Sequence, residues 1–264
     1  LVALDRAVRA YAPQVILHLA AAVGDRIDPD AARRANVDAP LALQRIALET
    51  GARLVVASTV LVLGLDDLVD ADETTPRTRD PMIPYVATKV QMEESLDLAR
   101  TTILRFPRIY GVNDRMILPQ MLKVMRAGQM ALIDGGRSLQ SFVHVDDAAA
   151  ACVLAMGAER ACGVYHITGG DRVTNREILD LIADAAGLPR VTKTAPRWLA
   201  LALARAYELL PLPPSDRLSR FRIKYLGCHH HYSIRKAQCE LGYEPQVRIR
   251  ETLPAVVRRS PTVY

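Results

Sequence analysis

Three short and almost uniformly apolar runs alternate with longer segments of helical pattern in the first part of the chain. The runs are QVILHLA (14–20), RLVVAST (53–59) and TTILRF (101–106), and helices are expected between them over 29–50 and 84–100. Such runs are typical of strands that are buried on both faces of a parallel sheet. Strands and helices that alternate in this way form α/β folds with right-handed crossovers. The pattern therefore predicts an α/β protein with a parallel sheet.

Glycines and prolines mark where predicted helices end and where loops are expected. Gly51 ends the first of these helices, and the Gly, Asp, Thr and Pro residues of 64–83 predict a loop. The regular alternation of long apolar runs and helical segments ends after residue 112. Beyond it, a strand is expected over 163–170 and helices are expected over 117–128, 175–187 and 196–210.

Composition narrows the class of protein. Half of the 264 residues are apolar and 24% are charged, which argues against a disordered chain. The formal charge of +5 comes from scattered arginines, so no nucleic-acid surface is expected. The longest uncharged run, 54–65, is too short to span a membrane. Four cysteines without C-x-x-C spacing predict reduced thiols in a cytoplasmic protein.

The carboxyl ends of parallel strands are where ligands bind, and several polar side chains are expected there. Ser58 and Thr59 end the second apolar run, and Tyr85 opens the helix that follows. Lys89 lies one helical turn after Tyr85, on the same face. A nearby ammonium lowers the pKa of a tyrosine, and such a phenol can move protons. The alternative is an exposed helix start with a polar face.

A second pair with the same spacing occurs near the C-terminus. Tyr232 and Lys236 follow three consecutive histidines, His229 to His231. No apolar strand leads into this pair, so we interpret Lys236 as a surface residue and give Tyr232 little functional weight. Consecutive histidines point in different directions, so a solvated loop is expected there, and no metal site.

Taken together, the sequence resembles the extended short-chain dehydrogenases/reductases, the NAD-dependent epimerase/dehydratase group. Eight pieces in the family's order carry the resemblance: ILHLAA (16–21), the helix around Asn36, VVASTVLVLG (55–64), YVATK (85–89), LRFPRIYG (104–111), FVHVDD (142–147), GVYHITGG (163–170) and ELGYEP (240–245).

The resemblance implies a Rossmann-like sheet, an NAD or NADP cofactor and a role for each matching residue. Tyr85 would be the catalytic acid/base, Thr59 the hydroxyl that binds the reacting oxygen, and Lys89 the residue that holds the nicotinamide ribose and lowers the Tyr85 pKa. Further residues match positions that line the cofactor: Ala20, Ala21, Asn36, Ser58, Phe106 and Pro107. Residues 1–112 would form the cofactor domain, to which 143–168 returns, and 113–142 and 169–264 a smaller, mostly helical substrate-binding part.

Within the family, the chain looks most like the 3β-hydroxysteroid dehydrogenase branch. Sugar-nucleotide members usually have an arginine just before the FVHVDD segment, where Gln140 and Ser141 stand here. An apolar helix in 196–214 would supply a wall for the substrate, or else lie in the core. Three arginines could meet an anionic substrate, although a surface role is as good an interpretation for each: Arg108, Arg115 and Arg137.

The family's Gly-rich loop, G-x-x-G-x-x-G, has no counterpart in this sequence. This loop binds the cofactor pyrophosphate at a helix N-terminus. Because the sequence opens at Leu1 within a helical pattern, we expect the segment that carries the loop to precede it. The chain as printed is therefore expected to bind dinucleotides weakly.

These observations predict an NAD(P)-dependent oxidoreductase that interconverts a secondary alcohol and a ketone on an apolar, steroid-like or β-hydroxy acid substrate. Two alternatives stay open: a nucleotide-sugar epimerase or dehydratase, and a non-catalytic dinucleotide-binding regulator. The expected partner is a small-molecule substrate, and a homodimer is a possible assembly.

Overall fold

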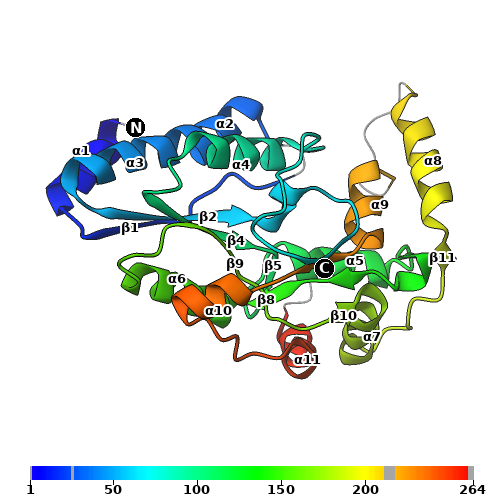
Figure 1. Cartoon of the computed structure of the whole chain (residues 1–264). Helices are drawn as coiled ribbons and strands as arrows, with labels where there is room; N and C mark the ends of the chain where they lie inside the picture. The colour runs from blue at the N-terminus through cyan, green and yellow to red at the C-terminus, as the bar shows by residue number, and fades with distance from the viewer. Residues whose placement is uncertain (1, 25–26, 211–217, 261–264) are drawn as a thin grey trace.

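A computed structural model describes residues 2–24, 27–210 and 218–260 (Figure 1). The first half of the chain contains α1 (Val2–Tyr11), β1 (Val15–His18), α2 (Pro29–Arg33), a π-helical turn η1 (Arg34–Asp38), α3 (Ala39–Thr50), β2 (Arg53–Thr59), η2 (Val60–Leu63), β3 (Leu68–Ala71), α4 (Pro84–Ser95), β4 (Thr101–Phe106) and β5 (Arg108–Tyr110). The second half contains α5 (Ile117–Arg126), β6 (Leu132–Ile133), η3 (Asp134–Gly136), β7 (Leu139–Gln140), β8 (Phe142–His144), α6 (Val145–Gly157), β9 (Gly163–His166), β10 (Val173–Thr174), α7 (Asn175–Ala186), β11 (Thr194–Ala195), α8 (Arg197–Glu208), α9 (Arg220–Gly227), β12 (His230–Tyr232), α10 (Arg235–Leu241) and α11 (Ile249–Arg259).

The central sheet is parallel, and its strand order is β1-β2-β4-β9. Helices α1 to α4 cover one face, and α6 and α10 cover the other (Figure 1). The predicted α/β class with a parallel sheet is confirmed. Because β9 pairs with β4, the chain returns to this sheet after residue 112. The proposed division into a cofactor part and a substrate part stays a prediction.

Strand β2 shows why the sheet is buried on both sides. Successive side chains of a strand point to opposite faces. Leu54 and Val56 pack with residues of α3 and α4, whereas Val55 packs with residues of α6. Burying an apolar side chain of this size contributes roughly 1.5–3 kcal/mol. Burial on both faces thus fixes the strand and sets its polar end, Thr59, at the carboxyl edge.

Two short strands lie where the sequence pattern indicated loops. The predicted loop 64–83 contains β3, and the supposedly solvated histidine segment contains β12, which pairs with β3 and β7. All three residues of β12 are buried, so the expectation of a solvated loop is wrong. The helix predicted over 84–100 ends earlier, at Ser95. In the described part of the chain, no helix is long and apolar enough to cross a membrane.

Candidate active site

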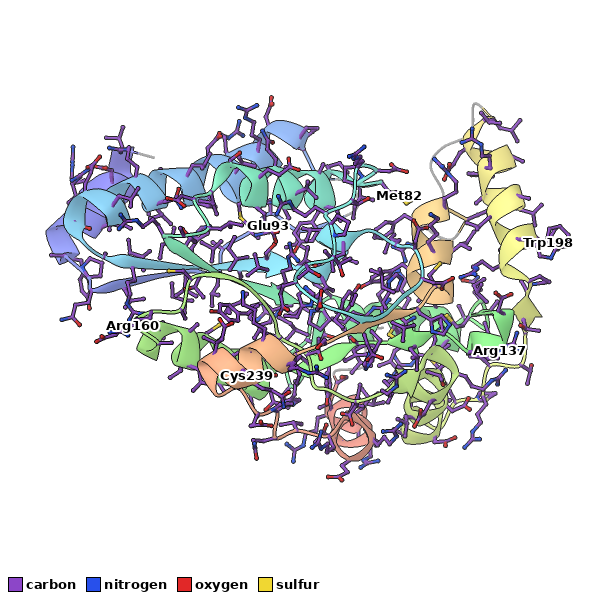
Figure 2. All side chains as sticks on the ribbon, in the orientation of Figure 1. Met82, Glu93, Arg137, Arg160, Trp198 and Cys239 are labelled. Atoms are coloured by element: carbon purple, nitrogen blue, oxygen red, sulfur yellow. The ribbon has the colours of Figure 1, made fainter. Side chains whose placement is uncertain are left out.

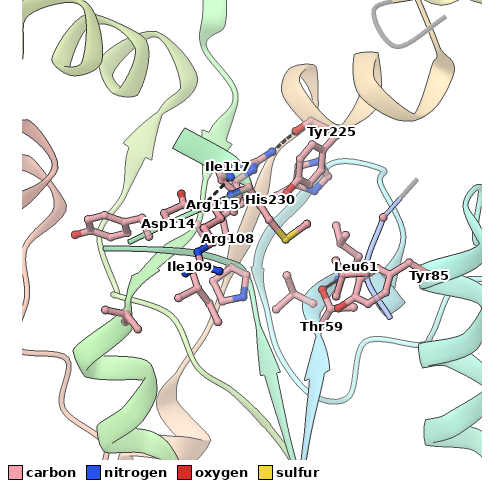
Figure 3. Close-up of a pocket in the computed structure, with 18 of the residues that line it drawn as sticks. Thr59, Leu61, Tyr85, Arg108, Ile109, Asp114, Arg115, Ile117, Tyr225 and His230 are labelled. Atoms are coloured by element: carbon pink, nitrogen blue, oxygen red, sulfur yellow. Dashed lines mark hydrogen bonds between the residues drawn. The ribbon is translucent and has the colours of Figure 1, made fainter. Parts of the chain in front are cut away.

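A pocket of about 670 Å³ opens beside the carboxyl edge of the central sheet. Its lining comes from the end of β2, the start of α4, the segment after β4, and parts of α9 and β12. Figure 3 shows Thr59 and Tyr85 on one side of the pocket and Arg108 on the other, with Tyr225 above them in this view. The parallel sheet therefore brings together residues that are far apart in sequence, at the edge where such folds bind ligands.

Thr59 and Tyr85 both line the pocket, and their catalytic roles stay predictions. The Thr59 hydroxyl is close enough to that of Tyr85 to influence its pKa, and the Thr59 oxygen accepts from the Leu61 backbone N–H at 3.3 Å. Burial raises the pKa of Tyr85 to about 12, although the Thr59 hydroxyl opposes the rise. The expected lowering of this pKa is wrong for the chain described here. At neutral pH Tyr85 is a phenol with a proton to give.

Lys89 is buried in the same helix, one turn beyond Tyr85. Its ammonium donates to the Ala57 carbonyl at 2.8 Å, and burial lowers its pKa to about 8, while Glu93 opposes this shift. An ammonium has three N–H groups, so two remain for other acceptors.

Ser58 turns away from the pocket. Its hydroxyl donates to the Glu93 carboxylate at 2.6 Å, and Arg105 Nη2 donates to the same carboxylate at 2.6 Å. Glu93 and Arg105 are both almost fully buried. Figure 2 shows Glu93 between α4 and the sheet. The structure thus gives Ser58 a partner in a buried ionic cluster, and its proposed contact with a cofactor remains untested.

Asn36 ties the loop after β1 to α4. Its amide oxygen accepts from the Ala22 N–H at 2.8 Å, and its amide nitrogen donates to the Ala22 carbonyl and the Thr88 hydroxyl at 2.9 and 3.0 Å. The buried Asn36 side chain therefore holds the loop after β1 in place through these hydrogen bonds. The predicted cofactor residues outside the pocket lining are Ala20, Ala21, Asn36, Ser58, Lys89 and Phe106, whereas Tyr85 and Pro107 line it. These assignments stay predictions.

The second Tyr–Lys pair lies in a different environment from the one expected. Tyr232 is buried and lines the pocket, and its hydroxyl has no hydrogen-bond partner among the described residues. Lys236 is half-buried, donates to the Val164 carbonyl at 2.9 Å and lies over the Tyr165 ring. The interpretation of Lys236 as a simple surface residue is wrong. No sequence signal marked the short strand β12 that carries Tyr232.

The apolar helix expected to wall the pocket, around Trp198 to Leu203, does not line it. Trp198 is 72% exposed, and Figure 2 shows it pointing outward from α8. Residues beyond 210 in this predicted stretch lie outside those described. Arg137 is exposed, as its surface interpretation predicted. No cluster of three or more His, Cys, Asp or Glu that could hold a metal occurs among the described residues.

Arg108 is the functional candidate that the sequence left undecided. It is buried, lines the pocket and donates to the Gln140 amide oxygen and, at 2.8 Å, to the Tyr225 carbonyl. Gln140 is fully buried and outside the pocket lining, whereas Ser141 lines it. Gln140 and Ser141 carry no charge themselves, but the Gln140 amide oxygen holds the Arg108 cation beside them.

Comparison with known proteins places these features in a family context. The sequence model of the NAD dependent epimerase/dehydratase family matches residues 1–168. A 2-alkyl-3-oxoalkanoate reductase of Stenotrophomonas maltophilia is 34% identical over 198 residues, which are 69% of this chain and 59% of that protein. A 4-hydroxy-2-methyl-3-oxo-4-farnesyl-3,4-dihydroquinoline-1-oxide ketoreductase of Stigmatella aurantiaca is 33% identical over 262 residues, 94% of this chain and 77% of that protein.

Solved structures share the fold. The UDP-glucose 4-epimerase of Thermotoga maritima, solved with UDP-glucose, matches with a TM-score of 0.72 and 22% identity, over 97% of this chain and 80% of that one. The enzyme WbmG of Bordetella bronchiseptica in complex with NAD gives a TM-score of 0.71 and 21% identity, over 97% and 74%. The chain thus spans most of these structures, but only 59% of the reductase from Stenotrophomonas.

Proposed function

Because the chain belongs to the NAD-dependent epimerase/dehydratase family, we propose that it is part of an NAD(P)-dependent oxidoreductase that interconverts a secondary alcohol and a ketone. The observation that carries the proposal is the pair of Thr59 and Tyr85 hydroxyls at a pocket of largely apolar lining. Two relatives named as reductases of oxo compounds with alkyl or farnesyl chains support an apolar substrate.

The residues present fit the nicotinamide end of the cofactor. Lys89 is buried beside Tyr85 with two N–H groups that the Ala57 carbonyl does not use, so it can hold a ribose hydroxyl. Bound NAD(P) would supply or accept the hydride. The Gly-rich turn that binds the pyrophosphate is absent from the printed sequence. The fit therefore concerns only the end of the cofactor where the chemistry occurs.

The proton step belongs to Tyr85 and Thr59. In the reducing direction, Thr59 and Tyr85 hydrogen-bond the ketone oxygen, and the Tyr85 hydroxyl gives its proton to that oxygen as it becomes an alcohol. In the oxidising direction, the phenolate takes the proton back. Because burial raises the pKa of Tyr85 to about 12, its hydroxyl is protonated at neutral pH and is in the form that ketone reduction needs.

A nucleotide-sugar epimerase is the second candidate, and Arg108 is the observation in its favour. A diphosphate brings charge that must be compensated by cations or several donors. Arg108 supplies one buried cation, and the polar Gln140 and Ser141 supply none. The apolar substrate therefore ranks first. A cytoplasmic location and a homodimer remain part of this proposal.

A substrate panel on the full-length protein tests the ranking. Hydroxysteroids, 3-hydroxy acids and their oxo forms are incubated with NAD(H) and NADP(H), and the reduced cofactor is followed by absorbance. UDP-sugars are assayed by product chromatography. We expect turnover of an apolar alcohol or ketone and none of UDP-sugars. Epimerisation of a UDP-sugar without activity on any apolar compound would reverse the order of the two candidates.

A further inference from the structure

The pocket contains a buried guanidinium that no carboxylate neutralises. Arg108 is only 8% exposed, and no Asp or Glu of the described residues lies within ion-pair distance of it. A buried cation without a counter-charge is costly unless a partner or ligand compensates it. Other buried or half-buried arginines of this protein have such partners: Arg105 pairs with Glu93, and Arg197 with Asp67.

Two aromatic rings and two hydrogen bonds hold the Arg108 guanidinium in place. The guanidinium carbon lies 3.7 Å from the centre of the Tyr225 ring and 5.4 Å from that of Phe142. Its two protein hydrogen bonds go to Gln140 and to the Tyr225 carbonyl. A guanidinium has five N–H donors, so three remain without an acceptor among the described residues. Stacking on a ring leaves these edges available for a planar anion.

The other charged groups of the pocket do not cancel this charge. Asp114 is the only acidic residue in the lining, and its carboxylate accepts from the backbone N–H groups of 116, 117 and 118 at the start of α5. Arg115 adds positive charge to the lining. His230 adds none at neutral pH, because burial and then Arg108 lower its pKa to about 4. The pocket is therefore positive at the side that carries Arg108.

We propose that Arg108 binds an anionic head group of the substrate, a carboxylate, so that the substrate is an oxo or hydroxy acid with an apolar body. This inference rests on the proposed function for the reacting carbon. Thr59 and Tyr85 lie on the opposite side of the pocket from Arg108 (Figure 3). One molecule can thus place its carbonyl carbon at the hydroxyl pair and its carboxylate at the arginine.

A phosphate could meet the same donors, and the structure favours the carboxylate. A single guanidinium presents two parallel N–H groups, which match the two oxygens of one carboxylate. Its contact with the face of the Tyr225 ring and its two hydrogen bonds hold that fork in place. A diphosphate carries at least two charges, and Arg108 is the only buried arginine among the described residues of the lining.

Direct binding to this chain tests the inference without any turnover. Calorimetry compares medium-chain hydroxy acids, with the hydroxyl at successive positions, against their methyl esters and against alkyl phosphates of equal length. A hydrogen bond to a charged group contributes about 1.5–3 kcal/mol, so we expect the best acid to bind about 10- to 100-fold more tightly than its ester. Arg108→Gln should remove this preference, and Arg115→Gln, an exposed arginine of the same lining, should keep it.

The outcomes separate this inference from the proposed function. Equal binding of acid and ester by the unaltered chain would overturn the inference, even if Arg108→Gln fails to fold. Tighter binding of the phosphate would overturn the choice of a carboxylate. Acid binding that depends on Arg108, without oxidoreductase activity in the full-length protein, would support the anion site and sink the proposed function. Turnover of neutral ketones without any preference for acids would support the proposed function and overturn the anion site.

Discussion

The Tyr85 hydroxyl can be tested alone, because Thr59 and the surrounding backbone hold the local geometry. Tyr85→Phe removes the proton donor and keeps the ring. General acid catalysis contributes typically 10²- to 10⁴-fold, so kcat of the full-length enzyme should fall by a factor in that range with a far smaller change in KM. The measurement is steady-state kinetics, with exposed Tyr11→Phe as the control. A variant with more than a third of the original kcat, about 0.6 kcal/mol in the barrier, would show that another group moves the proton.

The buried pair of Glu93 and Arg105 sets a second prediction at the same scale. Glu93→Gln keeps the shape of the side chain but leaves Arg105 charged and unpaired, and it weakens the bond from Ser58. Breaking one side of a buried pair typically costs 3–5 kcal/mol. Urea denaturation should show a loss of that order, whereas Glu94→Gln, exposed on the same helix, should change stability by less than about 0.5 kcal/mol. A loss below about 1 kcal/mol for Glu93→Gln would contradict the ionic cluster.

At the scale of elements, Asn36 joins the loop after β1 to helix α4. Asn36→Ala leaves the N–H and carbonyl of Ala22 without their partner. Each unsatisfied buried polar group costs about 1–3 kcal/mol, so we expect the loop to open locally and the Ala22 amide to exchange its hydrogen at least 10-fold faster. Hydrogen exchange by NMR measures this. Arg34→Ala, exposed in the same helical turn, is the control, and unchanged exchange at Ala22 would show that the loop is held elsewhere.

The buried strands of the central sheet were predictable from the sequence. β2 and β4 have the predicted bounds, because each is apolar on both faces and ends at polar or Pro residues. The place of Thr59 followed from the end of β2, and that of Tyr85 from the start of the helix α4. The short strands β3 and β12 were not predictable, because their pairing is non-local and their own residues are partly polar. Local patterns carry no information on such pairing.

The orientation of side chains could also not be predicted from the sequence. Ser58 and Thr59 are neighbours in a strand, so they point to opposite faces. Only the sheet's position decides which hydroxyl meets the pocket and which meets Glu93. Likewise, Arg108 became a pocket residue because Gln140 and Tyr225, distant in sequence, both accept from it. The resemblance to the family gave the residue types at the site, and the packing assigned their partners.

For the whole molecule, buried histidines predict how stability depends on pH. His166 and His230 are both buried. Burial, and then Arg105, lower the pKa of His166 to about 3, and burial, and then Arg108, lower that of His230 to about 4. Arg105 can only donate, so the His166 nitrogen 3.3 Å from it accepts and the ring is neutral. Both rings must therefore stay neutral in the folded protein, while in the unfolded chain they titrate near pH 6.5.

Because the unfolded chain binds more protons than the folded one below pH 6.5, stability is fully present above that pH and is lost as the pH falls toward 4. Between pH 7 and pH 5 each histidine should contribute a loss of about 2 kcal/mol. Burial lowers the pKa of Lys89 to about 8, so its titration changes stability only between that pH and its ordinary pKa. It therefore does not affect the difference in stability between pH 7 and pH 5. Urea denaturation at pH 7, 6 and 5 measures the slope. His230→Gln should flatten it by the share of one histidine, and equal stability at pH 7 and pH 5 would mean that both rings gain protons without unfolding.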